Sequence, residues 1–420
     1  MRPDPIPSKL FVRNRSKLAA AMAPGSMVLI PSAETKTRSG DQHYPYRQHS
    51  DFFYLTGVIQ ETCLLAFFPD HPDPDLREVL FIERSTSKSD LWNGPLPGPG
   101  ELGSLSGIGQ VRWLDEKKAV LEVLLRDSTM VYCDQELASL SSQARFGELS
   151  EQNRRPLAPL VGQLRMIKEP EEIDEIRKAI SITHTAFLEV LKKTKPGVWE
   201  YALEAEIIGA FIKNGAAGHA YDPILASGKN ALILHYIKNN SQCRDGALLL
   251  MDFGAEVNNY AADCSRTIPV NGRFSPRQRE LYEAVLRVFR QAREMMVPGT
   301  VLTEFHQAVG KLWEEEHIAL GLYSREDARV QPDEDPLWKT YYMHGTSHSL
   351  GLDVHDPFDR SLPFQPGMVF TCEPAIYIPE EQTGIRLENN ILISADGPVD
   401  LMESIPLEAD EIEELMNRKH

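Results

Sequence analysis

Two stretches of the chain are predicted to form hairpins that each carry two acidic residues on one face. The apolar run 247–251 indicates a buried strand that ends in Asp252, and the following strand contains Asp263. A four-residue turn at 256–259 would pair Asp252 directly with Asp263, with their Cβ atoms about 5 Å apart. Like charges opposed in a buried sheet require a cation or a shared proton.

The same arrangement is predicted near the C-terminus. Glu373 and Glu388 would face each other across a hairpin centred on the turn at 380–381, although a bulge in this longer turn would shift the register. Because side chains alternate along a strand, Cys264 and Cys372 should point to the opposite face, into the core.

Four carboxylates with a histidine make an oxygen-rich site that suits two hard divalent ions. The candidate histidines are His344, His348 and His355, which occur in one glycine-punctuated stretch just before the second hairpin. A single histidine is commonly a structural residue, but three so close together favour at least one metal ligand.

Composition and charge exclude several classes of protein. The net charge of -17 would repel phosphate backbones and anionic lipid, so we expect no nucleic-acid or membrane partner. The 420 residues contain no apolar run of about 18 residues, which argues against a membrane span. Five cysteines without a Cys-x-x-Cys motif indicate neither a disulfide framework nor a thiolate zinc site, and we expect a cytoplasmic protein.

We expect an α/β (α+β) protein with two domains. In the first, residues 1–165, polar and proline-rich loops separate short apolar runs, as in strands with intervening helices. These expected strands are 27–30, 52–56, 63–68, 79–82 and 130–132. The motif G-x-G-x-x-G at 98–103 follows no hydrophobic strand, so we expect a loop there rather than a dinucleotide site.

The second domain, residues 166–420, begins at a helix start around Pro170. Two long helices are each predicted to end at a Pro-Gly pair, at 196–197 and at 298–299, and each is followed by a second helix. This weak repeat predicts two duplicated α/β halves related by a pseudo-twofold axis. A serine hydrolase is disfavoured, because Ser349 stands where a nucleophile elbow around Ser347 would need glycine.

Several segments together resemble the pita-bread metallopeptidases, and most closely the Xaa-Pro aminopeptidases (aminopeptidase P). The resemblance spans nearly the whole chain and implies the pita-bread fold for residues 166–420 behind an N-terminal domain of the aminopeptidase P type. The motifs that carry it are Met251-Asp252-Phe-Gly, Tyr260-Ala-Ala-Asp263-Cys-Ser-Arg-Thr, His344-Gly-x-x-His348, Gly351-Leu-x-Val-His355-Asp356, Glu373-Pro and Arg386-Leu-Glu388.

The resemblance also implies roles for individual residues. The implied ligands of two divalent ions, expected to be Mn²⁺ in preference to Zn²⁺, Co²⁺ or Mg²⁺, are Asp252, Asp263, His348, Glu373 and Glu388. Glu373 is also the candidate proton shuttle, and His235 and His355 are candidates to hydrogen-bond the scissile carbonyl. His344, Arg386 and Tyr377 are expected around the ligands.

In the N-terminal domain, the segment 46–57 is similar to one in aminopeptidase P, which implies that Asp51 lies near the active site. His49 stands where that family often has asparagine. Trp92 resembles an aromatic residue that a neighbouring subunit contributes to the substrate pocket, and a homo-oligomer, dimer or tetramer, is expected.

The resemblance implies release of the N-terminal residue from Xaa-Pro peptides. Three alternatives stay open: a prolidase restricted to Xaa-Pro dipeptides, a non-catalytic pita-bread binding module, and a creatinase-like amidinohydrolase. The complete set of implied metal ligands argues against the binding module.

Overall fold

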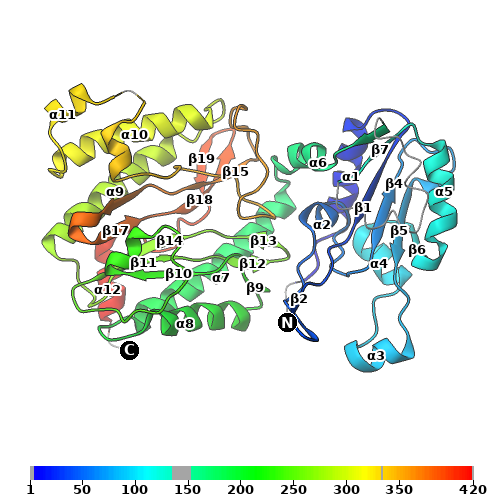
Figure 1. Cartoon of the computed structure of the whole chain (residues 1–420), viewed down its shortest axis with the longest axis horizontal. Helices are drawn as coiled ribbons and strands as arrows, with labels where there is room; N and C mark the ends of the chain where they lie inside the picture. Colours follow the sequence, from blue (N-terminus) through cyan, green and yellow to red (C-terminus); the bar gives the residue numbers. More distant parts are fainter. Residues whose placement is uncertain (1–3, 135–152, 333, 419–420) are drawn as a thin grey trace. The chain divides into compact units, whose positions relative to one another are not determined.

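The computed structural model describes residues 4–134, 153–332 and 334–418, and it divides into two compact units, 4–165 and 166–420 (Figure 1). None of the helices among these described residues is long and apolar enough to cross a membrane.

The N-terminal unit is built on a six-stranded sheet with the order β6-β5-β4-β1-β7-β8. The sheet strands are β1 (Ser26–Pro31), β4 (Leu64–Phe67), β5 (Glu78–Ile82), β6 (Gln110–Trp113), β7 (Met130–Tyr132) and β8 (Arg154–Arg155), and β2 (Thr37–Ser39) pairs with β3 (Gln42–His43) outside it. The helices are α1 (Lys9–Ala21), α2 (Ser50–Thr56), α3 (Ser87–Asn93), α4 (Pro99–Ser106), α5 (Lys117–Asp127) and α6 (Ala158–Arg165).

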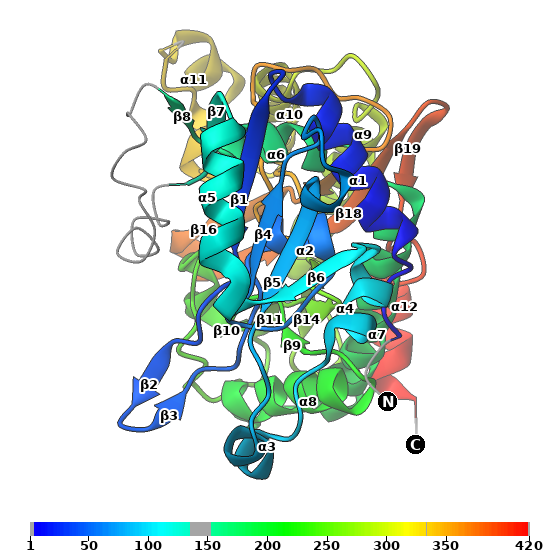
Figure 2. The same ribbon diagram turned by 90° about the vertical axis from the view of Figure 1, so that its right-hand side faces the viewer.

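The core of this unit lies between the sheet and α5, which crosses in front of the strands in Figure 2. Leu121 and Leu124 of α5 pack there with Met27 and Leu29 of β1 and with Phe81 of β5. All five residues are almost completely buried. Apolar strands at the centre of the sheet are what the short hydrophobic runs of the sequence predict.

Two sequence predictions in this unit are wrong. The run 52–56 is part of the helix α2 rather than a strand, and all seven residues of α2 are buried. A short helix that is buried on every side has the same apolar composition as a buried strand, so periodicity does not separate them. Residues 99–103 of the expected loop belong to α4, which begins with Pro99 at its first position, where the fixed φ of proline favours a helix start.

The second unit contains two helix pairs with strands between them. Its first half has α7 (Pro170–Lys193), α8 (Glu200–Lys213), β9 (Gly218–His219), β10 (Ile224–Ser227), β11 (Leu248–Asp252), β12 (Ala255–Val257), β13 (Tyr260–Ala261) and β14 (Ser265–Pro269). The second half has α9 (Pro276–Glu294), α10 (Leu302–Ala319), α11 (Arg325–Val330), β15 (Val369–Cys372), β16 (Ala375–Ile378), β17 (Thr383–Arg386), β18 (Asn389–Ser394), β19 (Gly397–Asp400) and α12 (Ala409–Asn417).

This arrangement confirms the predicted duplication. The long helices α7 and α9 both carry proline at their first turn and are both followed, after a Pro-Gly break, by a second helix. In Figure 1 the strands of both halves run across the middle of the unit, with α8 below them and α10 above. The sheets are β10-β11-β14 and β13-β12-β9 in the first half, and β15-β18-β19 and β16-β17 in the second.

The first hairpin differs from its predicted register by two residues. Its turn has two residues, Asn258 and Asn259, both with positive φ, so Asp252 pairs with Ser265 rather than with Asp263. Asparagine tolerates the left-handed conformation that such tight turns require. Because a shift of two residues keeps every side chain on its face, Asp252 and Asp263 remain on the same side of the hairpin.

The second hairpin has its predicted register. Cys372 pairs with Asn389, and Ala375 pairs with Arg386. These two pairings flank the glutamates and have the same register, which places Glu373 opposite Glu388. Cys264 and Cys372 are both fully buried, as predicted.

Candidate active site

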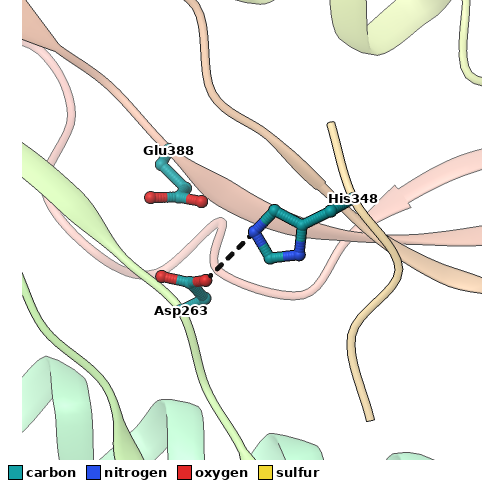
Figure 3. A group of neighbouring side chains, drawn as sticks. All are labelled: Asp263, His348 and Glu388. Atoms are coloured by element: carbon teal, nitrogen blue, oxygen red, sulfur yellow. Dashed lines mark ion pairs between the residues drawn. The ribbon is translucent and has the colours of Figure 1, made fainter. Parts of the chain in front are cut away.

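Three predicted ligands point toward one another from three separate segments of the second unit (Figure 3). Asp263 precedes β14, Glu388 lies between β17 and β18, and His348 lies in the segment before β15. One ligand atom from each lies within 4.8 Å of those from the other two. The dashed line in Figure 3 joins His348 Nε2 to Asp263 Oδ2 at 3.4 Å.

Asp252, at the end of β11, joins this group through a tyrosine that sequence analysis missed. The hydroxyl of Tyr221 lies 2.6 Å from Asp252 Oδ1 and 2.5 Å from Asp263 Oδ1. Burial raises the pKa of Tyr221 well above its usual value, and the two aspartates raise it further. Tyr221 precedes β10, which pairs with β11 and sets Ile224 opposite Asp252. Only the pairing of β10 with β11 would have indicated that Tyr221 belongs to the site.

Arg386 connects the two hairpins. Its Nη2 donates to Asp252 Oδ2 at 2.6 Å, its Nε donates to Ser265 Oγ at 2.7 Å, and its Nη1 donates to the hydroxyl of Tyr377 at 2.9 Å. Ser265 in turn donates from Oγ to Glu388 Oε2 at 2.7 Å. The buried guanidinium therefore holds Asp252 directly and Glu388 through Ser265, and these contacts use three of its five N–H donors.

Glu373 lies between two histidines. His348 Nε2 is 3.7 Å from Glu373 Oε1, and His344 Nδ1 is 3.7 Å from Glu373 Oε2. His344 Nε2 also lies 3.0 Å from the hydroxyl of Tyr377. These contacts bring Glu373, His344 and Tyr377 to the same site as the other predicted residues.

The electrostatics show how unfavourable this crowding of carboxylates is. Burial, opposed by Arg386, raises the pKa of Asp252 to about 6. Burial also raises the pKa of Glu373 to about 7 and that of Glu388 well above its usual value. Burial lowers the pKa of His348, but Asp263 and Glu373 outweigh this effect and raise it to about 9.

The donor set fits two divalent metal ions. Four carboxylates together with one imidazole provide the hard oxygen and nitrogen ligands that such ions prefer. These ligands could therefore hold the cations that the opposed carboxylates require.

His355 and His235 lie beside this group. The rings of His348 and His355 meet edge to face with centroids 4.2 Å apart. Burial lowers the pKa values of His344 and His355, and the proximity of His235 lowers both further. His235 itself is exposed, between Ile233 and Ile237.

The loop that carries His235 is fixed by a buried carboxylate that sequence analysis also missed. Glu200, at the start of α8, is fully buried and accepts hydrogen bonds from Ser227, Asn230, Tyr236 and Ser241 at 2.7–2.9 Å. Tyr236 adjoins His235, so this network restrains the histidine's backbone.

Two predicted residues lie in the N-terminal unit. Asp51 is buried on α2, and its Oδ1 accepts from Arg165 Nη1 at 2.6 Å. Burial raises the pKa of Asp51, and Arg165 opposes this effect. Trp92, on α3, is 78% exposed.

Comparisons with known proteins agree with this geometry. Residues 174–395 match the model of metallopeptidase family M24, and residues 11–132 match the aminopeptidase P N-terminal domain. The chain is 36% identical to the Xaa-Pro aminopeptidase of Escherichia coli, over 97% of each chain. It is 33% identical to human Xaa-Pro aminopeptidase 3, over 93% of this chain and 81% of the human protein.

Solved structures match equally well. A zinc-substituted Escherichia coli aminopeptidase P in complex with product aligns with a TM-score of 0.90 and 35% identity, over 99% of this chain and 100% of the other. A putative aminopeptidase P from Bacillus anthracis aligns with a TM-score of 0.90 and 32% identity, over 98% of each chain. The predicted resemblance and the predicted pita-bread fold are confirmed, and the chain belongs to metallopeptidase family M24, among the aminopeptidase P proteins.

Proposed function

We propose that this protein is a metal-dependent Xaa-Pro aminopeptidase that releases the N-terminal residue from peptides with proline in the second position. The observation that carries the proposal is the convergence of Asp263, His348 and Glu388, with Asp252 and Glu373 beside them, in a member of family M24. The names of the Escherichia coli and human relatives supply the substrate class.

The proposed metal ligands are Asp252, Asp263, His348, Glu373 and Glu388. Two divalent ions held there, Mn²⁺ in preference to Zn²⁺, Co²⁺ or Mg²⁺, would supply Lewis acidity and an activated water for peptide hydrolysis. The first hairpin contributes two aspartates and the second contributes two glutamates, so both halves of the unit would hold the same pair of ions.

The protein's own groups have separate tasks in this proposal. Glu373 would accept a proton from the attacking water and pass it to the leaving amine. His355 and His235 would hydrogen-bond the scissile carbonyl. Arg386, Tyr377 and His344 would hold the carboxylates in place, and Asp51 would act near the substrate from the N-terminal unit.

The surroundings of Arg386 favour an aminopeptidase over a prolidase. A prolidase must bind the carboxylate of the dipeptide with a cation just beyond the proline. Arg386 is buried and already donates to Asp252, Ser265 and Tyr377, so it supports the site instead of anchoring a substrate. The negative charge of the carboxylates also suits a free α-ammonium group.

A peptide series tests the proposal. We expect metal-supplemented enzyme to cleave Xaa-Pro-Yaa tripeptides and longer peptides at the Xaa-Pro bond, to lose activity when the N-terminus is acetylated, and to tolerate C-terminal amidation. If lengthening or amidation abolishes turnover while Xaa-Pro dipeptides remain good substrates, the protein is a prolidase. Absence of turnover in the metal-loaded protein would favour a binding module.

The proposal extends to the cellular setting. We place the protein in the cytoplasm as a homo-oligomer, a dimer or a tetramer, in which Trp92 would reach the substrate pocket of a neighbouring subunit. The high exposure of Trp92 on α3 supports this role. Substitution of Trp92 by alanine should raise KM for Xaa-Pro peptides without changing metal content, and an unchanged KM would contradict this role.

A further inference from the structure

The outward face of α8 is apolar from end to end. Its inward face buries Leu203, Ile207 and Phe211 in the unit. The outward side chains recur at helical spacing and are Tyr201, Ala205, Ile208, Gly209 and Ile212, which we call the α8 face. Tyr201 and Ile212 are each 51% exposed, and both views place α8 at the periphery of its unit (Figures 1 and 2).

Such a surface is unusual for a helix at the edge of a folded unit. Solvent-facing helix positions are normally polar, and contiguous exposed apolar residues mark an interaction site. Trp199 stacks on Tyr201 with ring centroids 5.4 Å apart and is itself 41% exposed, so it extends the α8 face beyond the helix start. Exposed tryptophan and tyrosine are the side chains that contribute most strongly to protein interfaces.

Gly209 adds an independent observation. A glycine inside a helix destabilises it relative to alanine. A Cβ atom added at Gly209 would meet no atom of the chain within 4 Å, so packing inside the molecule does not require glycine there. A glycine in this position allows another backbone to approach the helix closely from outside.

The pattern of the α8 face is complementary to itself. In an antiparallel pair of α8 helices about a twofold axis between residues 208 and 209, Ile208 lies opposite Gly209 of the other copy. In the same register Ala205 lies opposite Ile212, so large side chains meet small ones. Glu204 then lies opposite Lys213, so each copy contributes one acid and one base. One oxygen of Glu204 accepts from Asn239, which leaves its other oxygen for the lysine.

We propose that the α8 face binds the α8 face of a second copy of this chain, in an isologous antiparallel helix pair. Close approach over Gly209 and Ala205 lets Ile208 and Ile212 interdigitate, and the Glu204–Lys213 pairs at the rim fix the antiparallel register. This interface does not depend on the peptidase activity, and either can be wrong without the other.

The substitution Gly209→Arg tests the interface without disturbing the unit, because the added side chain has open space and removes a helix-destabilising glycine. Gly100→Arg on α4 is the matched control, since a Cβ there also meets nothing within 4 Å. In sedimentation velocity we expect the wild type and Gly100→Arg to share one oligomeric mass and Gly209→Arg to fall to half of it. The thermal midpoint of unfolding should confirm that both variants fold.

Charge exchange tests the register. Glu204→Lys alone and Lys213→Glu alone should each raise the dimer dissociation constant about tenfold, and the double exchange should restore it. A Gly209→Arg variant with the wild-type mass would overturn the proposal. So would a wild type that is monomeric at every accessible concentration, which would mean that another part of the same chain, or nothing, covers the α8 face.

Discussion

The two hairpins of the catalytic unit hold the same number of acidic residues but stabilise them differently. In the first hairpin a neutral hydroxyl, that of Tyr221, lies between Asp252 and Asp263. In the second hairpin the neighbours of Glu373 are His344 and His348, and Glu388 accepts from Ser265 of the first. Each pair therefore combines contacts within its own half with a contact from the other half, because Arg386 of the second hairpin donates to Asp252 and Ser265 of the first donates to Glu388.

Their turns also differ. The first hairpin turns through Asn258 and Asn259, both left-handed, whereas the second turns through a 3-10 helix (Pro379–Glu381) and a single left-handed residue, Gln382. The difference teaches that turn residues set the register, while the alternation of side chains along each strand decides which face a carboxylate occupies. Because a carboxylate needs only to lie on the correct face of its strand, the site is kept when the register changes by two residues.

The largest effect is expected from a ligand of the first hairpin. Asp263→Asn removes one ligand charge, so turnover of an Xaa-Pro tripeptide should fall about 100-fold or more while the fold persists. Glu388→Gln in the second hairpin should have an effect of the same order. Circular dichroism, metal analysis and turnover check these variants, with Asp396→Asn in the β18–β19 turn as a control. Wild-type turnover of Asp263→Asn at limiting metal would contradict its assignment as a ligand.

Tyr221→Phe tests how much the hydroxyl of Tyr221 contributes to positioning the two aspartates of the first hairpin. Without the hydroxyl, the two aspartates lose their shared donor, and we expect metal affinity to fall about 10–100-fold. Tyr282→Phe provides a control, because Tyr282 is a buried tyrosine whose hydroxyl donates to the carbonyl of Leu407, away from the carboxylates. Isothermal titration with Mn²⁺ would distinguish them. Equal affinities for wild type and Tyr221→Phe would show that Tyr221 does not position the aspartates.

The first hairpin should also make stability depend on pH. Glu172 on α7 accepts from the hydroxyl of Tyr260 on β13, and burial raises its pKa from 4.5 to about 7. Between these values the folded state binds more protons than the unfolded state, so the free energy of unfolding falls as pH rises from about 4.5 to 7. The loss is on the order of 1–3 kcal/mol.

Glu172→Gln should remove this part of the pH dependence and keep the hydrogen-bonding shape. Urea unfolding at about pH 5 and pH 8 measures it, and Asp174→Asn, an exposed position on the same helix, is the control. If the variant and the wild type lose the same stability between these pH values, Glu172 does not carry the effect.

The turns should give the smallest effects. Asn259→Val places a β-branched residue in a left-handed conformation and should cost about 1–2 kcal/mol of unfolding free energy, whereas Asn259→Gly should change it by a few tenths. Gln382→Gly in the second hairpin should stabilise the protein by about 0.5–1 kcal/mol. Equal urea midpoints for all three variants would mean that the turn conformations are not under strain.

Sequence analysis recovered the faces of the hairpins and lost details that depend on tertiary contacts. Strand alternation is local, so the carboxylates of both hairpins were grouped correctly even though the Asn258-Asn259 turn was not recognised as a two-residue turn. The helix α2 was predicted as a strand because its complete burial removes the helical period. Tyr221 and Glu200 act through partners distant in sequence, and no local pattern identifies such partners.

The central claim is that the four carboxylates and His348 hold two divalent ions, and the most direct measurement is the number of ions bound per chain. Equilibrium dialysis of metal-free protein against Mn²⁺, followed by elemental analysis, should give two ions per wild-type chain. Removal of both ions by a chelator should abolish cleavage of an Xaa-Pro tripeptide, and added Mn²⁺ should restore it. A chain that binds no ion, or one that cleaves the tripeptide equally well without metal, would contradict the account.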